Sequence, residues 1–75
     1  MKAEILVQFG QKVREERLER HLSQEQLAEI AGVHRTYVGM IERAEKNITL
    51  LNIEKIAKAL NLEISELLDV PDETK

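Results

Sequence analysis

Apolar residues recur at spacings of three and four along most of the chain, a period that predicts helices with one buried face. The first helix is predicted from about Ala3 to Arg20, and Gly10 interrupts it. Glu16 falls where its apolar stripe would next point inward, and His21 stands in the closing turn, where glycine is easiest to accommodate. The stripe consists of Ile5, Leu6, Phe9 and Val13.

Two short helices joined by a tight turn are predicted next. Ser23 is followed three residues later by Gln26, the spacing of a capping box at a helix start. Gly32 ends this helix because glycine readily adopts a positive φ, and the next helix runs from residue 34 or 35 to about residue 43. A short link with one glycine favours a sharp crossing of the two helices. The inward positions are Leu27, Ile30 and Ala31 in the first of them and Val38 and Ile41, with Glu42 beside them, in the second.

Thr49 is predicted to cap a fourth helix, and Asn61 to end it in the left-handed conformation. The buried stripe of this helix is Leu50, Ile53, Ile56, Ala57 and Leu60. A fifth, short helix covers roughly Ile64 to Leu68, and the acidic tail at residues 71–75 is expected to be disordered. No strand signal is visible. We therefore expect an all-α fold, with one compact five-helix domain over residues 1–70 and a helix-turn-helix unit at about residues 23–43.

The composition limits how such a domain can be stabilised. A chain of 75 residues forms one small domain that buries only about 60% of its unfolded surface. There is no cysteine, and the two histidines lie thirteen residues apart, so we expect neither a disulfide nor a metal site. Dimerisation is the remaining source of stability. The apolar run at residues 5–7 is too short for a signal peptide or a membrane span, so a cytoplasmic protein is expected.

The net charge of −3, taken alone, argues mildly against a nucleic-acid partner. The charge is unevenly distributed, however. Beyond Asn61 there are five acidic residues and one basic residue, which leaves residues 1–61 with a charge of +1. The net charge therefore does not exclude an anionic partner.

The chain lacks the side-chain sets that catalysis requires. Ser23 and Ser65 are better explained near helix starts than as nucleophiles, and the scattered glycines form no phosphate-binding loop. Acidic and basic residues interleave in the first helix, which is typical of a solvated, salt-bridged face. They are Glu15, Glu16 and Glu19 with Arg14, Arg17 and Arg20. We expect no enzymatic activity, no cofactor and no small-molecule ligand.

The third helix has an outward face suited to the major groove of DNA. That face is Arg35, Thr36, Gly39 and Met40, with Tyr37 and Arg43 at its edges. An arginine offers a two-pronged donor to guanine O6 and N7, and a threonine can bond a base or touch a thymine methyl group. Gly39, which weakens a helix, would let the backbone approach DNA closely. His34 is favoured as an N-terminal helix residue over a base reader.

Contacts to phosphate are expected beside this face. Gln24 begins the second helix, whose free N–H groups attract anions. Lys46, Asn47 and Thr49 precede the fourth helix and would hold the DNA backbone on the other side. Gln24 and Lys46 could instead be ordinary surface residues, and Arg35 could pair with Glu25 in the free protein.

The stretch LSQEQLAEIAGVHRTYVGMIERAEKNITLLNIEKIAKAL resembles the Cro/C1-type helix-turn-helix family, also called the xenobiotic-response-element regulators. The specific pieces are SQEQLA, AGV, the IER after the recognition helix, and the leucine-rich fourth helix. The resemblance extends from about Phe9 to Leu68. Within the family, HRTYVGMIERAEKNITL is most similar to the small controller proteins of restriction–modification systems, and it also resembles stand-alone repressors.

The resemblance implies a lambda-repressor-like DNA-binding domain that acts as a homodimer on a palindromic operator, in a bacterial or phage cytoplasm near the nucleoid. It implies base reading by Arg35, Thr36, Tyr37 and Gly39, with Met40 beside them. The implied phosphate contacts are Gln24, Arg43, Lys46, Asn47 and Thr49.

The resemblance also implies a buried ion pair between Arg17 and Glu42, which gives Glu42 a reason to face inward. The implied dimer seam comprises Leu51, Ile64 and Leu68, although Ile64 and Leu68 could simply close the monomer core. His21 and Glu16 depart from the family pattern and put the end of the first helix in doubt. The rival prediction is a protein-interaction module, antitoxin-like or an adaptor, which the acidic tail favours. A third, weaker alternative is an accessory subunit of an enzyme.

Overall fold

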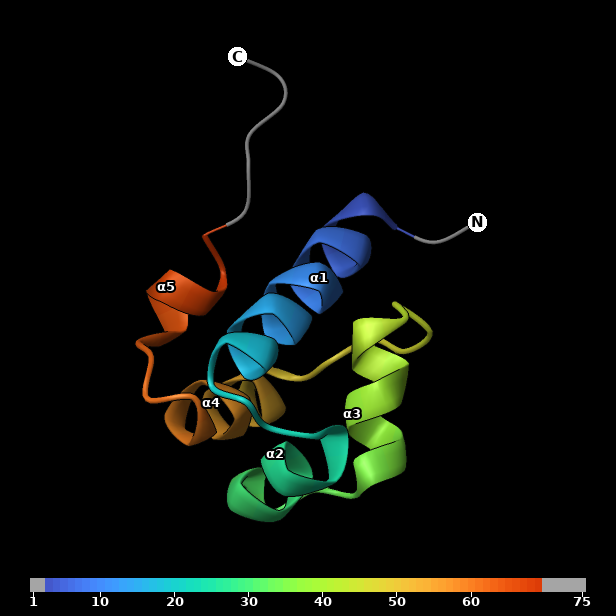
Figure 1. Cartoon of the computed structure of the whole chain (residues 1–75). Coiled ribbons are helices and arrows are strands. Elements are labelled where there is room, and N and C mark those ends of the chain that lie inside the picture. The colour runs from blue at the N-terminus through green and yellow to red at the C-terminus, as the bar shows by residue number, and fades with distance from the viewer. Residues whose placement is uncertain (1–2, 70–75) are drawn as a thin grey trace.

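The computed structural model describes residues 3–69, and within that range the chain forms five helices and no strand (Figure 1). They are α1 (Glu4–Glu19), α2 (Gln24–Ala31), α3 (Arg35–Glu42), α4 (Leu50–Ala59) and α5 (Ile64–Leu67). The prediction of an all-α, five-helix fold is confirmed. The tail at residues 71–75 lies outside the described residues.

Polar side chains begin α2, α3 and α4 in the way that the sequence indicates. Ser23 and Gln26 form a reciprocal capping box, with Ser23 Oγ accepting from the Gln26 N–H at 3.0 Å. Thr49 Oγ1 accepts from the N–H of Asn52 at the start of α4. His34 is the residue before α3, and its Nδ1 accepts from the N–H of Thr36 at 3.1 Å. Each cap satisfies a donor that the helix itself leaves unbonded.

Left-handed backbone conformations close several of the helices. Gly32 (φ 75°) ends α2 and Asn61 (φ 59°) follows α4, both as predicted. His21 adopts φ 58° after α1, so a residue with a side chain occupies the position where glycine would be easiest. Ala44 adopts the same φ after α3, which the sequence did not indicate.

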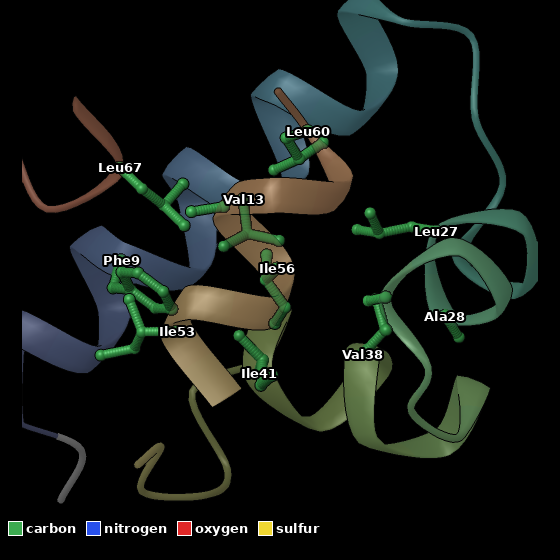
Figure 2. Close-up of a cluster of buried hydrophobic side chains, with 12 residues drawn as sticks. Phe9, Val13, Leu27, Ala28, Val38, Ile41, Ile53, Ile56, Leu60 and Leu67 are labelled. Carbon is green, nitrogen blue, oxygen red and sulfur yellow. The ribbon is translucent and has the colours of Figure 1, made fainter. Parts of the chain in front are cut away.

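One hydrophobic core joins α1, α3, α4 and α5 to α2 (Figure 2). Figure 2 shows Ile56 of α4 in the middle of the cluster, with Phe9 and Ile53 on one side and Leu27 and Val38 on the other. The fully buried larger side chains are Val13, Leu27, Val38, Ile56, Leu60 and Leu67. Burial of these side chains supplies most of the driving force for folding.

Three predicted core positions are wrong. Ile5, Ile30 and Leu50 are 53%, 58% and 74% exposed. Ile5 and Leu50 lie in the first turns of α1 and α4, which extend beyond the core. In α2 the inward stripe runs through Ala28 in place of Ile30.

Glu16 also has a simple explanation. Its carboxylate pairs with Arg20 at 2.8 Å and with Lys12 at 3.4 Å, while Arg17 takes the inward position next along the helix. The hydrogen bond from Arg20 lowers the pKa of Glu16 below its ordinary value, so the carboxylate remains charged beside the core.

Gly10 has a packing role that the sequence did not reveal. It is buried where α1 crosses the end of α3. A Cβ atom at this position would lie 2.5 Å from the carbonyl oxygen of Ile41 and 2.9 Å from that of Glu42. Both distances are shorter than a van der Waals contact, so only glycine allows the two backbones to approach this closely.

None of the helices within residues 3–69 combines the length and the apolar character that a membrane span requires.

Candidate nucleic-acid interface

Helix α3 is held on one face and open on the other. Val38 and Ile41 are buried in the core, and α2 and α1 pack against the same helix. Arg35 and Thr36, in its first turn, are exposed. In Figure 1, α2 and α3 lie together at the lower right, and α5 lies at the left. The helix-turn-helix unit therefore presents the start of α3 to solvent.

An ion pair between Arg17 and Glu42 connects α1 to the end of α3. Arg17 Nε lies 2.7 Å from Glu42 Oε2, and Arg17 Nη2 lies 2.9 Å from Glu42 Oε1. Arg17 Nη1 also donates to the carbonyl oxygen of Leu22 at 2.8 Å. The hydrogen bond from Arg17 to Glu42 raises the pKa of Arg17, and both side chains are almost completely buried. The paired geometry compensates for removing two charges from water.

Gln24 extends this network to the start of α2. Its Nε2 donates to Glu42 Oε1 at 3.1 Å, so the side chain is half-buried and not simply solvated. An amide group has two N–H donors, and one of them remains for another acceptor. The network thus fixes the Gln24 side chain at the edge of α3.

Gly39 is buried, which corrects the prediction that it lies open on the outward face. A Cβ atom here would lie 2.9 Å from Arg43 Nη1 and 3.4 Å from Gln24 Oε1. The absence of a side chain therefore makes room for these two polar side chains, which lie over the helix. Close approach of DNA to the Gly39 backbone would first require them to move.

Arg35 and Glu25 form an exposed ion pair between α3 and α2, with Arg35 Nη1 2.6 Å from Glu25 Oε2. Both side chains are about two-thirds exposed, at 67% and 66%. Such a pair contributes little to stability because water screens it. It leaves the arginine accessible in the free protein.

Tyr37 and Met40 are half-buried at the edges of α3. Tyr37 packs against the core, and its hydroxyl oxygen accepts a hydrogen bond from Nδ2 of Asn52 in α4 at 3.0 Å. Tyr37, a predicted base reader, therefore already has a partner within the protein for its hydroxyl oxygen. Met40 keeps part of its thioether side chain at the surface.

The segment between α3 and α4 carries the remaining predicted phosphate contacts. Lys46, Asn47 and Thr49 are exposed, and the Thr49 hydroxyl is used in the α4 cap. Arg43 pairs with Glu45 at 3.1 Å. An open groove of about 550 Å³ between α2 and α3 is lined by Gln24, Arg35, Thr36 and Arg43 among others. Lys46 and Asn47 do not line this groove.

Comparisons with known proteins agree with this geometry. The HTH_3 family model, described as helix-turn-helix, matches residues 13–67. The chain belongs to this helix-turn-helix family. The control protein C.SmaI of Serratia marcescens is 53% identical over 60 residues, which cover 80% of this chain and 71% of C.SmaI.

Solved structures of helix-turn-helix proteins have the same fold. The restriction–modification controller protein C.AhdI of Aeromonas hydrophila has a TM-score of 0.81 and 52% identity, over 83% of this chain and 94% of its own. SinR, the master regulator for biofilm formation, was solved in complex with DNA. It has a TM-score of 0.77 and 35% identity over 81% of this chain and 98% of its own.

In this helix-turn-helix chain, the residues predicted to form a dimer seam are not equivalent. Leu51 is 63% exposed and Leu68 is 38% exposed. Ile64 is half-buried and packs against the core, as the monomer alternative expected. Leu50, predicted to be buried, adds a second exposed leucine beside Leu51.

Sequence reasoning missed Asn52, which contacts the candidate site residue Tyr37. Asn52 lies fifteen positions after Tyr37 and on a different helix. The contact between them therefore cannot be recognised from spacing along one helix. The sequence offered one indication of this contact, a polar residue in the first turn of α4. A role in capping the helix explains that residue equally well. Glu25 was noted only as a partner for Arg35.

Proposed function

We propose that this protein is a sequence-specific DNA-binding transcriptional regulator that inserts α3 into the major groove. The supporting observation is the arrangement of α3, whose apolar face is anchored in the core while Arg35 and Thr36 remain exposed in its first turn. Helix-turn-helix proteins contact base edges with the N-terminal residues of this helix. Arg35 is the reader for guanine, and its ion pair with Glu25 is weak enough to be exchanged for a base.

The proposed phosphate contacts surround this face. Gln24 lies at the start of α2, Arg43 lies at the end of α3, and Lys46, Asn47 and Thr49 lie before α4. Tyr37, Gly39 and Met40 complete the proposed reading surface, and Gly39 would contribute its backbone once the side chains of Arg43 and Gln24 move aside. These contacts fix the position of α3 on the duplex, and the direct base contacts supply specificity.

We further propose that the protein binds a palindromic operator as a homodimer. The exposed side chains of Leu51 and Leu68 support a seam formed by α4 and α5, with Ile64 at its margin. A two-fold dimer would place two copies of α3 about 34 Å apart, which is one turn of DNA. The protein would work in a bacterial or phage cytoplasm, bound at the nucleoid, and without a cofactor.

The similarity to C.SmaI and C.AhdI supports a more specific assignment as a restriction–modification controller. A methyltransferase gene and an endonuclease gene next to this one would support it. Their absence would leave the broader regulator role.

Arg35 and Lys46 are expected to affect DNA binding differently. The probe is the duplex of highest affinity that the wild-type protein selects from a randomised pool, compared with a scrambled duplex by fluorescence anisotropy across salt concentrations. Arg35→Ala should reduce the preference for the selected duplex by ~1–3 kcal/mol per half-site. Lys46→Ala should weaken binding to both duplexes alike and reduce the salt slope by about one.

Arg14→Ala provides the control, because it removes an exposed positive charge from α1 at a residue that belongs neither to the lining of the α2–α3 groove nor to the proposed seam. This variant should bind both duplexes nearly as the wild type does. Equal affinity of the wild-type protein for the selected and scrambled duplexes, without salt dependence, would contradict the proposed function.

Leu51→Glu is expected to convert the dimer into a folded monomer, because the seam would bury two like charges without partners. Sedimentation velocity measures the mass, and circular dichroism checks the helices. Ile30→Glu is the control, since Ile30 is similarly exposed on α2, outside the seam. If Leu51→Glu remains dimeric, the seam lies elsewhere.

A further inference from the structure

A hydrogen bond from α4 reaches the recognition helix at Tyr37. Nδ2 of Asn52 donates to the Tyr37 hydroxyl oxygen at 3.0 Å, and both residues are half-buried. This hydrogen bond joins a side chain of α4 directly to a side chain of α3. It lies in the first turn of α4, beside the proposed seam residue Leu51.

The direction of this bond has a chemical consequence. A phenolic hydroxyl has one proton to donate and oxygen lone pairs that accept. When Asn52 donates to the oxygen, the Tyr37 proton is not needed for that bond. It remains available to an acceptor outside the protein, and the accepted bond strengthens the hydroxyl as a donor through polarisation.

A local contact holds the backbone of Asn52 in place. Its backbone N–H is bonded to Thr49 Oγ1 at 3.2 Å, which fixes the residue in the first turn of α4. With the backbone held there, the side-chain nitrogen of Asn52 reaches the Tyr37 hydroxyl oxygen.

We propose that Asn52 is a positioning residue for DNA reading, which orients the Tyr37 hydroxyl as a hydrogen-bond donor to an acceptor oxygen or nitrogen on DNA. This inference rests on the proposed function. The acceptor is either a phosphate oxygen or a base edge, and both share the same chemistry. If this hydrogen bond served only to hold α3 against α4, its loss would lower the stability of the fold. The direction of donation would then have no effect on DNA binding.

Asn52→Asp tests the direction of the bond with almost no change in shape. A carboxylate only accepts, so the Tyr37 proton would turn inward and be lost to DNA. An acidic residue near the start of a helix is favourable, so α4 should remain folded. The chain contains one tyrosine and no tryptophan, so the Raman doublet of tyrosine reports on Tyr37 alone. In the absence of DNA, the doublet of the wild type should be that of a hydroxyl that accepts from Asn52 and donates to water. In Asn52→Asp it should shift to the form of a strong donor, because the proton is given to the carboxylate.

A double-mutant cycle with Tyr37→Phe measures the effect on DNA. In the wild-type background, Asn52→Asp should weaken binding to the selected duplex by about tenfold beyond Asn61→Asp, the size of one hydrogen bond. Asn61→Asp adds the same charge at the other end of α4. In the Tyr37→Phe background the extra tenfold loss should disappear. Asn52→Ala, which removes the partner, should give a smaller loss that also depends on Tyr37.

Each outcome has one meaning. An unchanged Raman doublet, or an equal effect of Asn52→Asp in both backgrounds, would overturn this inference while leaving the regulator role intact. If the wild-type protein selects no duplex, the proposed function and this inference both fail. If Tyr37→Phe weakens the selected and scrambled duplexes alike, the acceptor is a phosphate oxygen. If it weakens only the selected duplex, the acceptor is a base.

Discussion

Replacing Glu42 with alanine is expected to lower the free energy of unfolding by about 3–5 kcal/mol. The substitution leaves the Arg17 guanidinium buried without its carboxylate, and Gln24 loses the acceptor for its Nε2. For a domain of this size the loss is a large part of the total stability. Urea denaturation followed by circular dichroism measures it, and the Glu42→Ala protein should be partly unfolded at room temperature.

Two further variants distinguish the effect of leaving a buried charge unpaired from the effect of removing a carboxylate. Glu45→Ala removes an exposed carboxylate that pairs with Arg43, so its effect should stay within about 1 kcal/mol. The double variant Arg17→Met, Glu42→Leu removes both charges and should be more stable than Glu42→Ala, because no buried charge is left unpaired. If Glu42→Ala and Glu45→Ala lose equal stability, the buried pair does not have the role described.

Gly10→Ala is expected to reduce the free energy of unfolding by about 2 kcal/mol, although alanine is the better helix former. The helix propensity of alanine favours the variant by about 1 kcal/mol. Against this, the added methyl group meets two backbone carbonyl oxygens, 2.5 Å and 2.9 Å away. Overpacking costs about 1–3 kcal/mol and more where backbone must move, so the clash outweighs the propensity. Thermal and urea unfolding should both reveal the loss.

Gly39→Ala is the matched control because it makes the same change in another helix. Its nearest obstacle is the end of the Arg43 side chain, which can move. Stability should be retained or increased by up to about 1 kcal/mol. A stabilised Gly10→Ala protein would show that α1 and α3 can separate without cost.

The sequence predicted the helices well because their signals are local. The Ser23 capping box, the Thr49 cap and the positive φ of Gly32 each depend on residues a few positions apart. Periodicity failed at Ile30 and Leu50, because it identifies an apolar face and not how far the neighbouring helices cover that face.

The site was less predictable, because its decisive contacts join separate helices. The Arg17–Glu42 pair was expected from the family resemblance, whereas the bond of Asn52 to Tyr37 and the packing of side chains over Gly39 were not. Gly10 and Gly39 look alike in the sequence, as glycines inside helices. One faces backbone and the other faces flexible side chains, and only the three-dimensional arrangement distinguishes them.

Ala44 determines how the chain leaves α3. The residue has a positive φ and is only 6% exposed, so its methyl group is packed while its backbone is in a conformation that costs an L-residue about 1–2 kcal/mol. The buried methyl group and the left-handed backbone of Ala44 together set the direction in which the chain leaves α3 towards Lys46 and Asn47. If Lys46 and Asn47 bind phosphate as proposed, this preset direction would reduce the conformational entropy lost on association with DNA.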